Sequence, residues 1–435
     1  MKRIKSKLLY VILSVSVLLL LVLLVLKLNT NHSSEVSISK EAANRPEQIK
    51  IMVDDTHYSY IKAISEQFEN QYGIKVNIIS MDFNLLYHRI EKSLNQSNTD
   101  LDLILVDTVW TPEFARAGYL EPLRNYAQSN LRDKIIPIAY DQRIISNDLY
   151  ALPELYAFPL SIEEKFLYYN EKLLKSAGIY APPSTWEELS EMTQYMRDKG
   201  LIDHGMIWGW SPGEGLVCDY TLLSNALGVQ SKDVNGHWIF DQGKGVTALS
   251  FMAHSLESGL SDPLSLRLSD REAVKKFAEG KTPFMIGWAY ADKMLNQKAD
   301  YKMSLVPGFK GYQKSSTVTG GGALSITRTS RHKDWAWKFI DLINSSREQI
   351  SPKDYIGSIP VWNDQISYFE NSDKYLNRNL MTEQFEYAIN RPTMSSYVEW
   401  SNIMQTSIDS ALNGKLTAKE ALNEAKHKVL QQEIK

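Results

Sequence analysis

The sequence predicts an α/β fold with a parallel sheet, in a chain long enough for more than one domain. Its 435 residues exceed what one domain of about 150 residues usually contains. Hydrophobic residues make up 43% of the chain and charged residues 23%, which is typical of globular proteins. Strand and helix patterns alternate from residue 49 onward, and this alternation indicates a parallel sheet covered by helices.

The first part of the chain carries this alternation most clearly. Strand patterns at 49–55, 74–82 and 101–110 are separated by helix patterns at 57–73 and 83–98. The third strand, LDLILVDTVW, is almost continuously apolar, as expected of a parallel strand covered on both faces. Ligands bind at the carboxyl ends of such strands, where the sequence places Asp54, Asp82, Asp107 and Trp110.

The rest of the chain continues with mixed elements. The segment 164–179, EKFLYYNEKLLKSAGI, has the pattern of a strand followed by a helix, and the last third of the chain is mostly helical. At 277–294, FAEGKTPFMIGWAYADKM, an apolar strand ends on Trp288, and Tyr290 follows two residues later. Two large aromatic side chains at the end of a buried strand indicate either core packing or a ligand platform.

The N-terminus predicts a membrane anchor. Four positive charges in MKRIKSK precede an apolar run from Leu8 to Leu26, close to the length of about 20 residues that spans a bilayer. No small-residue cleavage site and no lipid-accepting cysteine follows the run. We therefore expect residues 1–28 to be a transmembrane signal anchor and 29–47 a tether, with the remainder outside the cell membrane. A cleaved signal and a secreted protein are the alternative.

Charge and motif content exclude several function classes. The formal net charge is −3 without a basic stripe, so nucleic acid is not an expected partner. Cys218 is the single cysteine, which rules out an internal disulfide and a cysteine-based zinc cluster. The histidines form no metal-ligand pair, and no P-loop or nucleophile elbow is present. We expect no metal, no cofactor and no catalysis.

Seven segments along the chain carry a resemblance to a known family. They are FENQYGIKV, LDLILVDTVWTPEFARAGYLEPL, YALPELYAFPLSIEEKFLYYNEKLLKSAGIYAPPSTWEEL, AVKKFAEGKTPFMIGWAYADKM, LVPGFKG, GGGALSITRTSRHKDWAWKFIDLI and LNGKLTAKEALNEA. In this order and spacing the chain resembles the extracellular solute-binding proteins of ABC importers, in the sugar-binding branch (family 1, maltodextrin-binding-like). The resemblance covers nearly all of residues 48–430.

This resemblance implies a two-lobe periplasmic-binding-protein-like fold of type II, with a hinge between the lobes and the ligand bound between them. Lobe one would comprise residues 48–155 and 305–345, and lobe two residues 156–304 and 346–435. The implied function is to capture a sugar or oligosaccharide without turnover and deliver it to the permease subunits of an ABC importer. We expect a monomer.

The strand ends and the resemblance together give a candidate ligand site. Trp288 matches a position where family members place an aromatic side chain, which would stack on the apolar face of a sugar ring. Asp107 would accept hydroxyl hydrogen bonds, or else cap the helix that follows it. The predicted ligand-binding residues are Asp54, Tyr58, Asp107, Trp110, Tyr156, Trp210, Trp288, Tyr290, Gly321 and Tyr397.

Two other interpretations stay open on the sequence. The same fold would also suit a polyol, a peptide or an anion, although an anion site needs convergent arginines and the strand-end loops show no arginine cluster. The adjacent acids Glu163 and Glu164 suggest a surface glycoside hydrolase. Adjacent strand residues face opposite ways, however, so these two would not form a facing pair.

Overall fold

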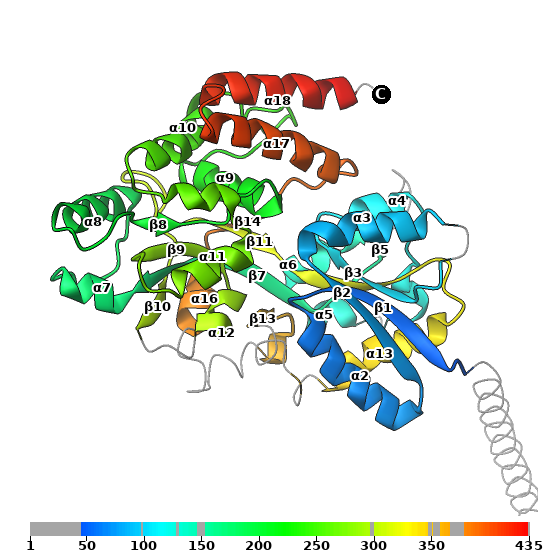
Figure 1. The fold of residues 1–435 in the computed structure, drawn as a ribbon. Helices are drawn as coiled ribbons and strands as arrows, with labels where there is room; N and C mark the ends of the chain where they lie inside the picture. The colour runs from blue at the N-terminus through cyan, green and yellow to red at the C-terminus, as the bar shows by residue number, and fades with distance from the viewer. Residues whose placement is uncertain are drawn as a thin grey trace, which may run out of the picture.

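A computed structural model describes residues 45–96, 99–127, 130–145, 153–295, 300–346, 350, 357–365 and 378–433. The chain forms two α/β lobes, each built on its own sheet (Figure 1). The predicted anchor at 1–28, and the tether as far as residue 44, lie outside the described residues. Within the described part of the chain, no helix is long and apolar enough to cross a membrane.

The first sheet confirms the parallel strands that the sequence predicts. Its order is β2–β1–β3–β12–β6, in which β1 pairs in parallel with β2 and with β3, and β12 runs antiparallel to β3. Because β1, β2 and β3 run in the same direction, their carboxyl ends meet at one edge of the sheet. The strands are β1 (Gln48–Asp54), β2 (Lys75–Met81), β3 (Leu103–Asp107), β6 (Phe158–Pro159) and β12 (Gly322–Ile326).

Helices cover this sheet and begin where its strands end. The helix α2 packs on β2 and on α13, and it ends at Gly73, whose φ of 63° is a left-handed conformation suited to glycine. Asp82 begins α3 by accepting a hydrogen bond from the backbone N–H of Asn84 at 2.9 Å. The helices are α2 (Tyr58–Tyr72), α3 (Phe83–Leu94), α4 (Thr111–Arg116), the short 3-10 helix η1 (Leu123–Asn125), α5 (Leu131–Lys134), α6 (Pro137–Asp141) and α13 (Lys333–Ser346).

The second sheet is built around one long buried strand, β7. It pairs antiparallel with β9, β10, β11 and β13, and the main order is β14–β11–β7–β9–β8. A separate pair joins β4 (Ile144–Ile145) to β5 (Glu154–Leu155). The strands of this sheet are β7 (Ser161–Asn170), β8 (Met206–Ile207), β9 (Phe284–Trp288), β10 (Tyr301–Ser304), β11 (Thr317–Gly320), β13 (Ile359–Pro360) and β14 (Ala388–Ile389).

The second lobe carries most of the helices, and α17 and α18 pack as a pair over α9 and α10 (Figure 1). Thr185 begins α8 by accepting from the N–H of Glu188 at 3.1 Å. In α9 almost every residue is buried, because the helix lies between β11 and α17. The helices are α7 (Glu171–Ser176), α8 (Trp186–Asp198), α9 (Glu214–Ala226), α10 (Gly243–Glu257), η2 (Pro263–Arg267), α11 (Asp270–Phe277), α12 (Tyr290–Leu295), α16 (Arg378–Phe385), α17 (Tyr397–Leu412) and α18 (Ala418–Glu433).

The chain crosses between the sheets at two adjoining points, one between β6 and β7 and the other between β11 and β12, and it crosses again between α13 of the first lobe and β13 of the second. Gly321 lies at the second point with φ 139°, and a Cβ there would approach the carbonyl oxygen of Ser161 to 2.3 Å. Arg143 fixes the same residue by donating from Nη2 to the carbonyl of Gly321 at 2.7 Å. The lobe boundaries expected at 155/156 and 304/305 lie a few residues and about fifteen residues, respectively, before the first two of these points. The reason is that β6 still pairs with β12 of the first sheet, and β11 still pairs with β7 of the second.

Candidate functional site

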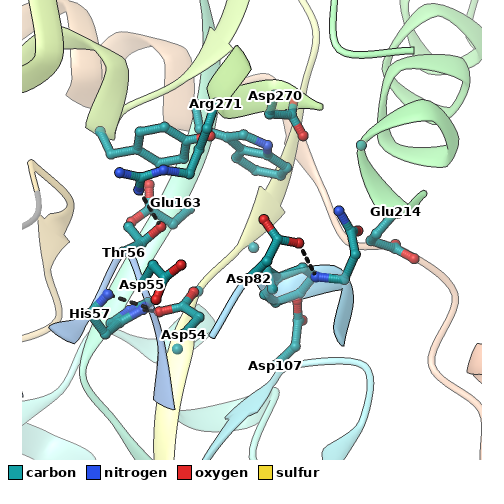
Figure 2. A pocket seen from close by; sticks show the side chains of 18 of the residues that line it. Asp54, Asp55, Thr56, His57, Asp82, Asp107, Glu163, Glu214, Asp270 and Arg271 are labelled. Atoms are coloured by element: carbon teal, nitrogen blue, oxygen red, sulfur yellow. Dashed lines mark hydrogen bonds and ion pairs between the residues drawn. The ribbon is translucent and has the colours of Figure 1, made fainter. Parts of the chain in front are cut away.

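A cavity of about 890 Å³, counting the open space at its mouth, lies between the two sheets. From the first lobe, the ends of β1, β2 and β3 supply one wall; from the second lobe, β7, β9 and the first turns of α9 and α11 supply the other (Figure 2). The lining residues are Asp54, Asp55, Thr56, His57, Asp82, Phe83, Asn84, Leu105, Val106, Asp107, Glu163, Glu214, Gly215, Ser269, Asp270, Arg271, Trp288, Tyr290, Gly320, Gly321, Gly322 and Arg391.

The structure brings half of the predicted residues to this cavity and places the others elsewhere. Asp54, Asp107, Trp288, Tyr290 and Gly321 line it. The remaining five, Tyr58, Trp110, Tyr156, Trp210 and Tyr397, are absent from the lining.

Side-chain packing explains these displacements. The ring of Trp110 turns into the core and stacks on Phe83, with 5.0 Å between centroids. Trp210 stacks on Trp208 at 4.7 Å and donates from Nε1 to Asp219. These buried rings fill the lobes behind the cavity walls.

The other three predicted residues are also kept out of the cavity lining by their local surroundings. Tyr58 is 39% exposed on the first turn of α2, whereas Tyr156 is buried next to β5. The hydroxyl of Tyr397 donates to Glu214, so this tyrosine supports a cavity residue from behind.

Asp54 and His57 form a buried pair on the wall from the first lobe. Oδ1 of Asp54 accepts from the backbone N–H of His57 at 2.8 Å and lies 2.7 Å from its Nδ1. Burial would lower the pKa of His57, but the carboxylates of Asp54, Glu163 and Asp107 together raise it. Nε2 of His57 lies 3.3 Å from Oγ of Ser161. This serine is buried and does not line the cavity, so the Asp–His–Ser chain braces the lobes rather than presenting a nucleophile.

Asp107 is held by an arginine that the sequence did not suggest. Nη2 of Arg391 donates to Oδ1 of Asp107 at 2.6 Å, and its Nη1 donates to Oε1 of Glu214 at 2.9 Å. Burial would raise the pKa of Asp107, but Arg391 lowers it, so the carboxylate is ionised. The helix-cap alternative for Asp107 is wrong, because Trp110 is the N-cap of α4.

The wall from the second lobe presents two aromatic rings. Trp288, at the end of β9, is the half-buried residue of an otherwise buried strand. Lys165 Nζ lies 5.0 Å from the Trp288 ring centroid, and the guanidinium of Arg271 lies 5.7 Å from the ring of Tyr290. Nη1 of Arg271 also donates to Oγ1 of Thr56 at 3.0 Å, which joins the two walls.

Carboxylates dominate the polar lining, as Figure 2 shows for Asp54, Asp55 and Asp82 on one wall and Asp270 on the other. Asp55 accepts from the hydroxyl of Ser80, and Asp82 from a helix N–H, so oxygen lone pairs remain on both. The lining therefore offers mainly hydrogen-bond acceptors beside an aromatic surface. Among the described residues, no cluster of His, Cys, Asp or Glu could hold a metal ion.

Comparisons with known proteins agree with this architecture. The family model described as bacterial extracellular solute-binding protein matches residues 54–350. The chain belongs to this family.

Several relatives of this solute-binding protein span nearly its whole length. A maltooligosaccharide ABC transporter solute-binding lipoprotein of Streptococcus pneumoniae is 22% identical and covers 87% of both chains. The maltodextrin-binding protein MdxE of Bacillus subtilis is 21% identical over 89% of this chain and 91% of its own. Among solved structures, maltose-bound MalE3 of T. maritima matches with a TM-score of 0.80 at 24% identity, covering 88% of this chain and 99% of that one. The last comparison confirms the two-lobe fold.

Proposed function

We propose that this solute-binding protein captures a sugar or short oligosaccharide in the cavity between its lobes and delivers it to an ABC importer. The observation that carries the proposal is the half-buried ring of Trp288 in a cavity whose polar lining is mainly carboxylate. A pyranose has an apolar C–H face and a rim of hydroxyl donors. The ring would pack on that face, and the carboxylates would accept from the rim.

The electrostatics of the lining support a donor-rich ligand over an anion. Arg271 and Arg391 are the arginines of the lining, and each already binds oxygen atoms of the first lobe. An anion entering the cavity would therefore face unneutralised carboxylates such as Asp55 and Asp82 without a free arginine to pair with. Polyols and peptides stay alternatives, since both also carry hydrogen-bond donors.

We propose further that the protein binds without turnover. The matched family and the relatives above are binding proteins. Glu163 lines the cavity, but Glu164 does not and is completely buried, so these two acids form no pair across a bound sugar. Incubation with the tightest ligand, followed by mass spectrometry of the products, tests this. Steady hydrolysis would support the glycoside hydrolase alternative instead.

A defined ligand panel tests the binding proposal. We take maltose, maltotriose, D-tagatose, ribitol, a dipeptide mixture and phosphate, and measure thermal shifts and then calorimetric titrations on residues 45–435. A ligand that binds only the native state raises the melting temperature in a concentration-dependent way. We expect at least one sugar to bind and phosphate not to bind. Binding of the peptides or phosphate alone would contradict the proposal.

The membrane attachment is a separate proposal on residues 1–28, with 29–47 as a tether and the lobes of the monomer outside the cell. Its support is the length of the apolar run and the preceding positive charges. Intact-mass measurement on protein extracted from membranes decides it. A mature chain that starts near residue 30 would contradict the anchor while leaving the export of the protein intact.

A further inference from the structure

Lys165 is a buried ammonium behind the cavity wall of the second lobe. Its side chain is 0% exposed, and Nζ donates to Oδ1 of Asp219 at 2.7 Å and to Oδ1 of Asp270 at 3.1 Å. The same nitrogen lies 5.0 Å from the ring centroid of Trp288. Asp270 and Trp288 line the cavity, whereas Lys165 does not. The buried ammonium of Lys165 therefore contacts two groups that a bound ligand would touch.

Contacts with both neighbouring strands fix the backbone position of Lys165. Lys165 lies opposite Trp288 in the register of β7 and β9. On its other side, the N–H of Lys165 donates to Oγ1 of Thr317 at 3.0 Å, and the hydroxyl of Thr317 donates to the carbonyl of Lys165 at 2.8 Å. The lysine is thus held from both neighbouring strands, and its ammonium has little freedom to move relative to the ring.

The surrounding charges keep the ammonium protonated. Burial alone would lower the pKa of Lys165, but Asp219 and Asp270 together raise it above its usual value. Asp219 in turn accepts from Nε1 of Trp210 at 3.1 Å through its second oxygen. A chain of contacts therefore runs from Trp210 through Asp219 and Lys165 to the cavity, although Trp210 itself does not reach it.

We propose that Lys165 is a positioning residue for ligand binding, because its ammonium holds the Trp288 ring and the Asp270 carboxylate in the orientations that the ligand meets. The proposal rests on the proposed function in taking Trp288 and Asp270 as ligand contacts. A ring attracted to a fixed cation on one side, and a carboxylate attached to the same cation, are oriented before the ligand arrives. Such preorganisation lowers the entropy lost on binding.

The orientation of Trp288 is tested without any ligand. The protein is labelled with 5-fluorotryptophan, and Trp288→Phe identifies the fluorine resonance of Trp288. Two variants remove the ammonium: Lys165→Met, and the double variant Lys165→Met, Asp219→Asn. The double variant leaves fewer unpaired buried charges, so it can be used if the single variant folds poorly. Lys333→Met is the matched control, because Lys333 pairs with Glu121 at 2.8 Å in the first lobe. We expect the Trp288 resonance to shift or broaden in the Lys165 variants only. An unmoved resonance in folded Lys165 variants would overturn the proposal.

The consequence for binding is tested with the tightest sugar of the panel above. We expect the Lys165→Met, Asp219→Asn variant to weaken binding by about tenfold, within the coupling range of contacting residues. The same change made in Trp288→Ala should weaken binding by a smaller factor, because the ring that Lys165 positions is gone. Equal factors in both backgrounds would show a merely structural lysine and overturn the proposal. If no sugar binds the unaltered protein, the proposed function fails, and the fluorine spectrum still decides the role of Lys165.

Discussion

Arg391 donates a hydrogen bond from Nη2 to Oδ1 of Asp107 at 2.6 Å, although 284 residues separate them in the sequence. Its other terminal nitrogen donates to Glu214 at the start of α9. One buried guanidinium thus joins the end of β3 in the first lobe to a helix of the second. The relative position of the two walls depends in part on this contact.

Asp107→Asn should lower the free energy of unfolding by about 3 kcal/mol, near the low end for a broken buried ion pair, because Glu214 still neutralises part of the charge of Arg391. Urea denaturation at neutral pH measures the change. The control is Arg132→Gln, whose ion pair with Asp141 at 3.3 Å is exposed on both sides, and we expect a change within about 0.5 kcal/mol. Equal effects of the two substitutions would contradict a special role for the Asp107 pair.

Glu164 should make the stability of the protein depend on pH. Burial, and then the charge of Glu163, raise the pKa of Glu164 well above its ordinary value, and no described group hydrogen-bonds its carboxyl oxygens. The folded state therefore holds a proton that the unfolded state releases above its ordinary pKa. This contribution to stability is present at low pH and is lost as pH rises through the folded pKa.

Glu164→Gln keeps the shape of the neutral acid and cannot ionise. We expect this variant to be more stable than the unaltered protein at about pH 8, and the difference to shrink toward about pH 5. Melting temperatures across this range measure it, with Glu171→Gln on the surface as the control. A variant that is less stable than the unaltered protein at high pH would show that the carboxylate is paired.

Gly320→Ala should disturb the Trp288 ring from its edge. A Cβ at residue 320 would lie 3.3 Å from Cζ3 and 3.4 Å from Cη2 of that ring, closer than most such contacts. We expect binding to weaken by about 1 kcal/mol, the low end for overpacking. The loss should shrink in a Trp288→Phe background, since the smaller ring lacks those two atoms. Calorimetric titration of the unaltered protein, the two single variants and the double variant measures these losses in affinity. An equal loss in both backgrounds would show that Gly320→Ala does not act through the Trp288 ring.

The parts of the site that depend on neighbouring residues could be predicted from the sequence. Asp54, Asp82 and Asp107 each follow an apolar strand, and parallel strands bring their ends together. Trp288 could be predicted because an apolar strand pattern ends on it and because it matches an aromatic position of the family, and the structure leaves it half-buried at the end of β9. His57 stands three residues after Asp54, and this spacing is a sequence signal for an Asp–His pair at the end of the strand.

The parts that depend on tertiary packing could not be predicted. Arg391 and Glu214 come from segments far apart in the chain, and no local pattern connects them with Asp107. For Trp110 the sequence predicted a contact that the structure does not show: its position at a strand end suggested a ligand contact. The rings of Phe83 and Tyr87 on α3 give Trp110 a core to pack in, so Trp110 is buried there and does not line the cavity.

Calorimetric titration of Trp288→Ala with the tightest sugar of the panel tests the central claim most directly. Stacking and apolar burial of this size stabilise a complex by about 1–3 kcal/mol, so affinity should fall by about ten- to a hundredfold. Trp288→Phe should recover part of the loss, and urea melts should show that both variants fold. The contradicting result is unchanged affinity in folded Trp288→Ala, above all if its unfolding free energy drops by the roughly 3–5 kcal/mol expected of a vacated core tryptophan.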